Sequence, residues 1–190
     1  ALPQCLDHVQ NAIGWTGKRA RPKGHGALRR GIGMAMAMHV SGNRTIGNWD
    51  GSTIVLKVNE DGRAIVQTGE SDMGQGAFTM LAQICAQEMS IPVDHVTVRP
   101  PDTDTSPYGI GTLASRVTIN AGIAMVEAAR MARAEILEAA SEKFGHASEA
   151  LEIRDGAVRS KGSGNLVAGL DEVCRYHIFR HGGDGILVKF

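Results

Sequence analysis

Aromatic residues and net charge are both scarce in this 190-residue chain, and each scarcity limits what it can bind. Aromatic side chains make up 4% of the chain, and 20 Lys and Arg residues are balanced by 20 Asp and Glu residues. Proteins that bind nucleic acids usually carry a basic surplus with interleaved aromatic residues, so no nucleic-acid partner is expected. The sequence also lacks a secretory leader and an apolar run of the about 20 residues that cross a membrane, so no membrane association is expected.

Cysteine is rare too, and its spacing excludes several kinds of site. Cys5, Cys85 and Cys174 are odd in number and far apart, and no CxxC pair occurs. Neither an iron–sulfur cluster nor a structural zinc site is therefore expected in this chain, and a reduced, cytoplasmic setting fits best. His177 and His181 are four residues apart but lack the acidic companion of an HExxH motif, so we interpret them as surface histidines and predict no metal ligand.

The remaining composition is that of a globular protein rich in glycine. Hydrophobic residues make up 43% and charged residues 21%, and there are 24 glycines, which indicates many tight turns or close backbone approaches to a bound group. Residues 1–50 carry seven Lys and Arg against two Asp, whereas residues 51–110 carry three basic residues against eight acidic ones. This asymmetry suits packing of one segment on the other, or on partner chains.

Hydrophobic periodicity predicts an alternation of helices and strands. The expected elements are helices over 4–14, 77–89, 118–144 and 170–179, hairpins over 53–68 and 151–160, and strands over 32–40, 95–98 and 186–190. The strand over 32–40 would be buried, with Met34, Met36 and Met38 packed in the core. The strand over 186–190 has nothing after it, so we interpret the chain as a segment that further polypeptide completes.

This order of elements predicts an α+β fold with mixed sheets, in which β-hairpins are flanked by helices. We expect residues 1–26 to form an N-terminal helix and a basic linker, and residues 27–190 to form the main domain.

The first candidate site is Met73, Gly74, Gln75 and Gly76, between a predicted strand and the helix over 77–89. The first N–H groups of a helix have no partner within it and can receive an anion, and glycine lets a ligand come close. Gln75 adds amide donors and an acceptor without charge. These features predict a phosphate or an oxygen-rich ligand, although a tight turn also explains these residues when they are taken alone. The GxGxxG and GxxxxGK[ST] patterns are absent, so no ordinary nicotinamide or ATP site is expected.

A second site of the same kind precedes the helix over 118–144. It consists of five consecutive residues with two hydroxyls and a guanidinium: Ala114, Ser115, Arg116, Val117 and Thr118. Arg116 could pair bidentately with a phosphate at the positive end of the helix. The alternative is plain capping, with Ser115 or Thr118 as the N-cap and Arg116 paired with a surface carboxylate. Two such loops in one domain favour a large polyanionic ligand.

These loops carry a resemblance to a known family. Residues 68–76 (TGESDMGQG) resemble the (D/E)MGQG loop of the molybdopterin-binding subunits of molybdenum hydroxylases, the xanthine dehydrogenase and aldehyde oxidase family. Residues 111–118 (GTLASRVT), with Ala121 and Gly122, resemble that family's G-(T/S)-x-x-S-R-x-T loop, and residues 91–98 (IPVDHVTV) with 102–104 (DTD) are similar to the link between the two. The resemblance covers about residues 30–179.

The resemblance implies a partial cofactor-binding domain of an oxidoreductase that hydroxylates an aromatic heterocycle or an aldehyde with water-derived oxygen. The cofactor would be molybdopterin with molybdenum, in the cytosine dinucleotide form, and no side chain here would ligate the metal. The first loop would line the pterin and phosphate end of the cofactor through Met73, Gly74, Gln75 and Gly76. The second loop, residues 114–118, would contact the phosphates and the part of the pterin near the metal. Iron–sulfur clusters and FAD would lie on partner subunits or domains, as would the rest of the molybdenum-binding polypeptide.

Departures from the family pattern limit what the chain can do alone. The family's catalytic Glu belongs to a C-terminal Gly-Glu segment that this sequence lacks, and Glu70 belongs to the first loop, so no catalytic residue is predicted. The upstream glycine–phenylalanine loop is absent as well, and Leu113 stands where relatives often have an aromatic or small residue. We therefore expect the isolated chain to be inactive. One alternative is a non-catalytic domain that mediates subunit contact without cofactor, and another is an unrelated binder of phosphate ligands.

Overall fold

The computed structural model describes residues 2–20, 26–39, 41–42, 50–183 and 185–190. The chain separates into two compact units, Ala1–His39 and Val40–Phe190. The predicted division at residue 26 stays a prediction about domains, whereas the compact units divide after residue 39.

The described residues of the first unit form the helices α1 (Leu2–Ile13) and α2 (Trp15–Ala20). α1 confirms the helix predicted over 4–14, and it is amphipathic but buries none of its residues. The predicted linker is in part helical, because α2 covers its first residues, while residues 21–25 lie outside the described part of the chain.

The buried strand predicted over 32–40 was wrong for the residues that the structure describes. Residues 32–39 have no regular secondary structure, and Val40 lies outside the described residues. Met36 and Met38 are 65% and 92% exposed, so they do not form core positions. A strand needs a neighbour for its backbone N–H and C=O groups, and no described segment pairs with this one.

The second unit is built on a mixed four-stranded sheet with the order β3-β2-β1-β7. β1 (Ile54–Val58) and β2 (Ala64–Thr68) form the predicted hairpin, with Leu56 opposite Val66 and Gly62 in the turn at φ 77°. β7 (Ile186–Lys189) pairs antiparallel with β1, so the C-terminal strand has a partner within the chain. β3 (Val96–Val98), preceded by a 3₁₀ turn over Val93–His95, lies parallel to β2, and α3 (Ala77–Met89) makes the crossover between them.

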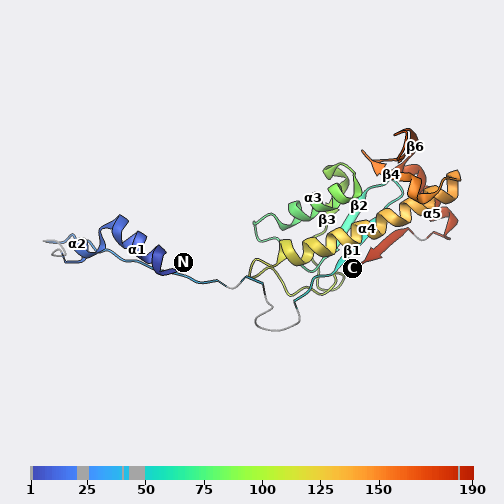
Figure 1. Ribbon diagram of the computed structural model, residues 1–190. Helices are drawn as coiled ribbons and strands as arrows, with labels where there is room; N and C mark the ends of the chain where they lie inside the picture. Colours follow the sequence, from blue (N-terminus) through green and yellow to red (C-terminus); the bar gives the residue numbers. More distant parts are fainter. Residues whose placement is uncertain (1, 21–25, 40, 43–49, 184) are drawn as a thin grey trace. The chain divides into compact units, whose positions relative to one another are not determined.

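α3 and α4 (Val117–Phe144) pack on one face of this sheet (Figure 1). Alternate strand residues such as Ile54, Leu56 and Val66 point into this layer and are fully buried, as the period of a strand requires. The face that α4 buries is dominated by small residues, chiefly alanines and Gly122, which let α3 approach closely. α4 ends before Gly145, whose φ of 70° confirms the predicted left-handed C-cap.

The remaining elements lie beside the C-terminal half of α4 (Figure 1). They are a second 3₁₀ turn (Ser148–Ala150), β4 (Leu151–Arg154), β5 (Ala157–Ser160), β6 (Leu166–Gly169) and α5 (Leu170–Arg180). α4 contacts the second 3₁₀ turn, β4 and α5. β4 and β5 confirm the second hairpin, whereas β6, the third strand of the small sheet, was not predicted. The fold is thus α+β with mixed sheets, as the sequence predicts. None of the helices in the described residues is long and apolar enough to cross a membrane.

Candidate functional site

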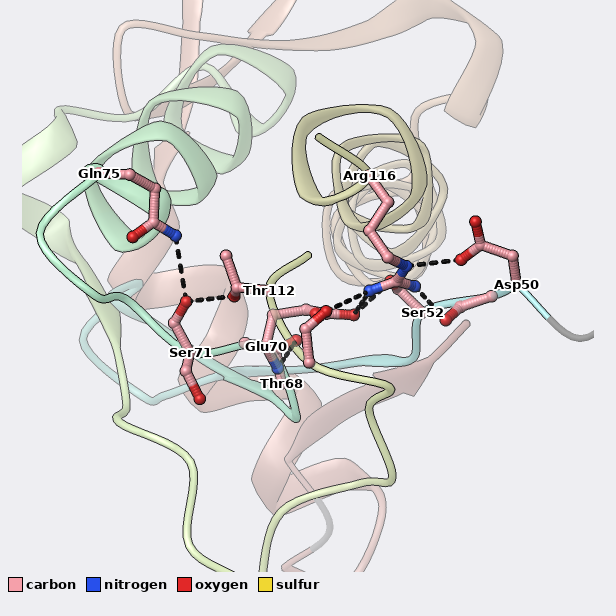
Figure 2. A network of polar contacts seen from close by, with 10 residues as sticks. Asp50, Ser52, Thr68, Glu70, Ser71, Gln75, Thr112 and Arg116 are labelled. Carbon is pink, nitrogen blue, oxygen red and sulfur yellow. Dashed lines mark hydrogen bonds and ion pairs between the residues drawn. The ribbon is translucent and has the colours of Figure 1, made fainter. Parts of the chain in front are cut away.

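The two glycine loops lie against each other at the start of α3 and α4. A Cβ added to Gly69 would lie 2.4 Å from both the Gly109 nitrogen and the Pro107 carbonyl oxygen, so the two backbones approach more closely than any side chain allows. The Thr112 hydroxyl donates a hydrogen bond to the Ser71 carbonyl oxygen (Figure 2). Segments about 40 positions apart in the sequence therefore form one site.

Three glycines of these loops leave open space that a side chain would otherwise fill. Gly74, Gly76 and Gly111 have φ angles of 102°, 83° and 103°, and nothing lies within 4 Å of a Cβ built on any of them. Positive φ favours glycine at each position, and the open backbone can come close to a bound group. The geometry therefore fits a cradle for a ligand.

The N-terminus of α3 is already occupied by a carboxylate of the chain itself. Asp72 Oδ1 accepts hydrogen bonds from the Gly74 and Gly76 N–H groups at 2.8 and 3.3 Å, and Oδ2 accepts one from the Phe78 N–H group at 3.1 Å. The hydrogen bonds from Gly74 and Phe78 lower the pKa of the Asp72 carboxyl. The sequence predicted free amides here, and the structure corrects this, because Asp72 takes the place that an external anion would take.

Gln75 is folded back onto its own loop. Its Oε1 accepts a hydrogen bond from the Met73 N–H group at 2.6 Å. Its Nε2 donates to the Ser71 carbonyl oxygen at 3.1 Å, as Figure 2 shows. A primary amide has two N–H donors and an oxygen that accepts two bonds, so one donor and one acceptor position remain. Gln75 can therefore hold a neutral group of mixed donors and acceptors.

The start of α4 differs from the start of α3. Its N-cap residue is Arg116, whose side chain does not cap the helix, so neither Ser115 nor Thr118 is the N-cap that the sequence predicted. The first amides of a helix have no intrahelical partner, and within the described part of the chain no side chain takes the place here that Asp72 takes at the start of α3. Ser115 and Thr118 are exposed beside them, and Ala114 and Ser115 adopt left-handed φ angles of 49° and 55°, which are unfavourable for residues other than glycine.

The Arg116 side chain points into the protein, where every N–H group of its guanidinium has an acceptor. Nε donates to Asp50 Oδ1 at 2.5 Å, and Nη1 donates to Glu70 Oε1 at 2.6 Å and to the Gly111 carbonyl oxygen at 3.1 Å. Nη2 donates to the Gly51 carbonyl oxygen at 2.5 Å and to Ser52 Oγ at 2.9 Å. Figure 2 shows the guanidinium amid these partners. An arginine has five N–H donors, so none remains for a phosphate, and the bidentate phosphate contact expected from the sequence is not available in this arrangement.

The charged side chains of Arg116, Glu70 and Asp50 are buried. Arg116 is 1% exposed and Glu70 is fully buried, and the Asp50 side chain is 4% exposed. Burial lowers the pKa of the Arg116 guanidinium, but its hydrogen bonds to Glu70 and Asp50 raise that pKa by more, so the residue stays charged. Glu70 forms an ion pair with Arg116 here, and its exclusion as a catalytic base stays a prediction.

Sequence reasoning missed three residues of the site, Asp50, Ser52 and Asp72. Asp50 and Ser52 lie in a loop with no motif of their own, more than 60 positions before Arg116, so no local signal marks them. Asp72 did leave a signal, because an Asp side chain in a turn often accepts a hydrogen bond from the backbone amide two residues further on, which here is that of Gly74.

Two histidines at the C-terminal end of α5 lie beside each other. The rings of His177 and His181 on α5 lie 4.5 Å apart, and burial, followed by the neighbouring His181, lowers the pKa of His177. No group of three His, Cys, Asp or Glu side chains in the described part of the chain could hold a metal ion.

Comparisons with known proteins agree on one family. The family model described as the molybdopterin cofactor-binding domain matches residues 8–185. The putative xanthine dehydrogenase molybdenum-binding subunit of Escherichia coli K12 is 34% identical over 138 residues, which are 72% of this chain and 18% of that protein. The carbon monoxide dehydrogenase large chain of Afipia carboxidovorans is 41% identical over 80 residues, 42% of this chain and 10% of that one.

Solved structures show the same likeness in three dimensions. A copper- and molybdenum-containing carbon monoxide dehydrogenase superimposes with a TM-score of 0.68 at 26% identity, covering 80% of this chain and 20% of that one. Quinoline 2-oxidoreductase from Pseudomonas putida 86 gives a TM-score of 0.65 at 26% identity, covering 79% and 20%. The chain thus spans at most about a fifth of the length of these relatives.

Proposed function

The chain belongs to the molybdopterin cofactor-binding domain family of the molybdenum hydroxylases, and from this premise we propose that its two glycine loops together cradle the organic part of a molybdenum cofactor. The observation that carries this proposal is the pairing of a carboxylate-filled helix start with an open one. Asp72 occupies the amides at the start of α3, whereas the side chain of Arg116, the N-cap residue of α4, turns inward to Asp50 and Glu70, and no other side chain of the described residues takes a place like that of Asp72 there.

The difference between the helix starts assigns the parts of the cofactor to the loops. An uncapped helix N-terminus favours a negative charge, so the phosphates would lie at the start of α4. There the exposed hydroxyls of Ser115 and Thr118 would donate to phosphate oxygens, beside the first amides of the helix and the backbone of Ala114 and Val117.

The first loop suits an uncharged, flat heterocycle instead. The Asp72 carboxylate would repel a phosphate from the amides of Gly74 and Gly76. The free donor and acceptor of Gln75 match the mixed edge of a pterin ring, and the 73% exposed Met73 offers an apolar surface for its face. The expected Mo-cofactor residues 73–76 would thus hold the pterin rather than its phosphates.

When bound, the cofactor would supply the two-electron chemistry that hydroxylates an aromatic heterocycle or an aldehyde with oxygen from water. The residues of this chain would bind and orient it, and the catalytic carboxylate would come from another segment of the large subunit. We further propose the cytosine dinucleotide form of the cofactor, with iron–sulfur and flavin partners that carry the electrons away. All three cysteines are free thiols, which supports a reducing, cytoplasmic setting.

The test is the molybdenum and phosphorus content of the chain purified from a host that makes the cofactor. We expect molybdenum in the wild-type chain, together with a pterin chromophore and cofactor phosphate. Thr118→Val should lower the occupancy about tenfold, since a hydrogen bond to a charged group is worth about 1.5–3 kcal/mol. Gln75→Leu should lower it by a similar factor.

Thr97→Val is the matched control, because Thr97 is an exposed hydroxyl residue on β3 and belongs to neither loop. Its molybdenum content should equal that of the wild type. Absence of molybdenum from every preparation, in a correctly folded chain, would favour the non-catalytic domain. Retention of a nucleotide without a pterin chromophore would favour the unrelated phosphate binder.

A further inference from the structure

The buried Arg116 joins three separate segments of the chain. Its acceptors come from the loop over residues 50–52, from Glu70 in the first glycine loop and from Gly111 in the second. Ser52 closes the network, because its hydroxyl donates to Glu70 Oε1 at 2.6 Å and accepts from Arg116. We refer to Arg116, Glu70, Asp50 and Ser52 as the buried clamp.

We propose that Arg116 is a positioning residue for the cofactor, which fixes the two glycine loops relative to each other through the buried clamp and does not touch the cofactor itself. This inference rests on the proposed function, since it concerns the same two loops. It assigns Arg116 a role different from the phosphate contact that its place in the motif predicts.

The full burial of Arg116 and Glu70 makes the clamp act as one unit. A buried charge that loses a partner costs far more than an exposed one, because water cannot replace the missing hydrogen bond. A shift of any of the three segments would leave either the guanidinium or a buried carboxylate without its partner. The positions of the two loops are therefore coupled to each other through a residue at the N-cap of α4.

Short covalent and hydrogen-bonded paths connect the clamp to the proposed binding groups. Glu70 precedes Ser71, whose carbonyl oxygen accepts from both the Gln75 amide and the Thr112 hydroxyl. A displacement of Glu70 would thus reorient the Gln75 amide. On the other side, Arg116 follows Ala114 and Ser115 directly, and both are held in the left-handed region.

Ala114 and Ser115 need tertiary contacts to stay in the left-handed region. Residues other than glycine disfavour this region, so a loop free of tertiary contacts would leave it. The Ala114 carbonyl accepts from the Gly42 N–H group, and Arg116 N donates to the Leu113 carbonyl at 3.1 Å. Together with the five guanidinium bonds these contacts hold Ser115 where its hydroxyl faces outward beside the α4 amides.

The test separates this role from a direct phosphate contact by changing Glu70 rather than Arg116. In Glu70→Ala the guanidinium keeps its charge and gains a free donor, so a direct phosphate ligand would retain or improve cofactor binding. A positioning role predicts at least a tenfold loss of molybdenum per chain, and partial recovery in Glu70→Gln, whose amide oxygen can still accept from Arg116 and Ser52. Equal or higher molybdenum in Glu70→Ala would overturn the inference.

Amide hydrogen exchange of the cofactor-free chain provides a second readout that does not depend on the proposed function. We expect Glu70→Ala to speed exchange in peptides covering residues 111–118 as well as 69–76, although only the first loop is altered. Faster exchange confined to 69–76 would overturn the coupling. If the wild type holds no molybdenum, the proposed function fails, and this measurement still decides the clamp.

Two further variants distinguish a loss of cofactor positioning from a general loss of folding stability. Leu151→Ala removes a buried side chain of β4, in the small sheet, and should lower the melting temperature without lowering the molybdenum content of the folded fraction. If molybdenum falls with melting temperature in Leu151→Ala as it does in Glu70→Ala, the role is merely structural. Should Glu70→Ala fail to fold, Ser52→Ala removes one donor and one acceptor of the clamp, and the same two readouts apply to it.

Discussion

The close contact of Gly69 with Gly109 gives the most quantitative prediction of this structure. In Gly69→Ala, the new Cβ would lie 2.4 Å from two backbone atoms, and ordinary contacts begin at 3.4 Å. The loops would have to separate by about 1 Å, and neither neighbour is a side chain that can turn away. Inserting atoms into a packed site costs about 1–3 kcal/mol, and we expect the upper end because backbone must move.

Urea unfolding of the purified chain is the assay. With a slope of about 2 kcal/mol per molar urea, a loss of about 3 kcal/mol lowers the unfolding midpoint by about 1.5 M. Gly109→Ala should cost a similar amount, since its Cβ would lie 2.6 Å from the Gly69 carbonyl group. The double variant should cost clearly less than the sum, because one separation of the loops accommodates both methyl groups.

Gly162→Ala is the control, since nothing lies within 4 Å of its Cβ and its φ is not in the left-handed region. It should change the free energy of unfolding by at most about 0.5–1 kcal/mol. A midpoint for Gly69→Ala within about 0.3 M of the wild type would refute the close approach of the two loops, and full additivity of the double variant would refute the shared displacement.

Three further predictions concern the loops and the thiols. Backbone hydrogen bonds from Gly74 and Phe78 lower the pKa of Asp72 in the folded state, so the carboxylate stabilises the fold above the ordinary pKa of 3.8. This stabilisation is lost as the pH falls through the lowered pKa. The wild type should therefore be more stable than Asp72→Asn at pH 7, and the urea midpoints of the two proteins should converge in acid. Ser115→Gly, at φ 55°, should stabilise the cofactor-free chain by about 1 kcal/mol, and it should lower the molybdenum content of the chain purified from a host that makes the cofactor; a loss of stability in urea would contradict the left-handed assignment. Burial raises the pKa of the Cys85 and Cys174 thiols to about 12. A disulfide reagent at pH 8 should therefore react only with the exposed Cys5 in the native chain, and with all three thiols in urea. Rapid reaction of two or three thiols in the native chain would contradict their burial.

Local signals account for the parts of the fold that were predicted. The β1–β2 hairpin follows from alternating residues around Gly62, and α4 follows from a run of good helix formers that ends at Gly145. β6 was missed because Leu166–Gly169 is short and surrounded by glycine and serine, so only its pairing with β5 makes it a strand. The reverse error arose at residues 32–39, where apolar residues alternate but no described strand pairs with them.

The sequence by itself determined the two glycine loops, their place before α3 and α4, and the family to which they belong, because motif order and spacing are properties of the chain. It did not determine which charged groups of these loops are free. The amides at the start of α3 and the Arg116 guanidinium both look available to a ligand in the sequence, yet Asp72 binds these amides, and Asp50, Glu70 and Ser52 bind the guanidinium. Only the tertiary structure decides this, since the availability of a charge depends on partners and burial supplied by segments distant in the sequence.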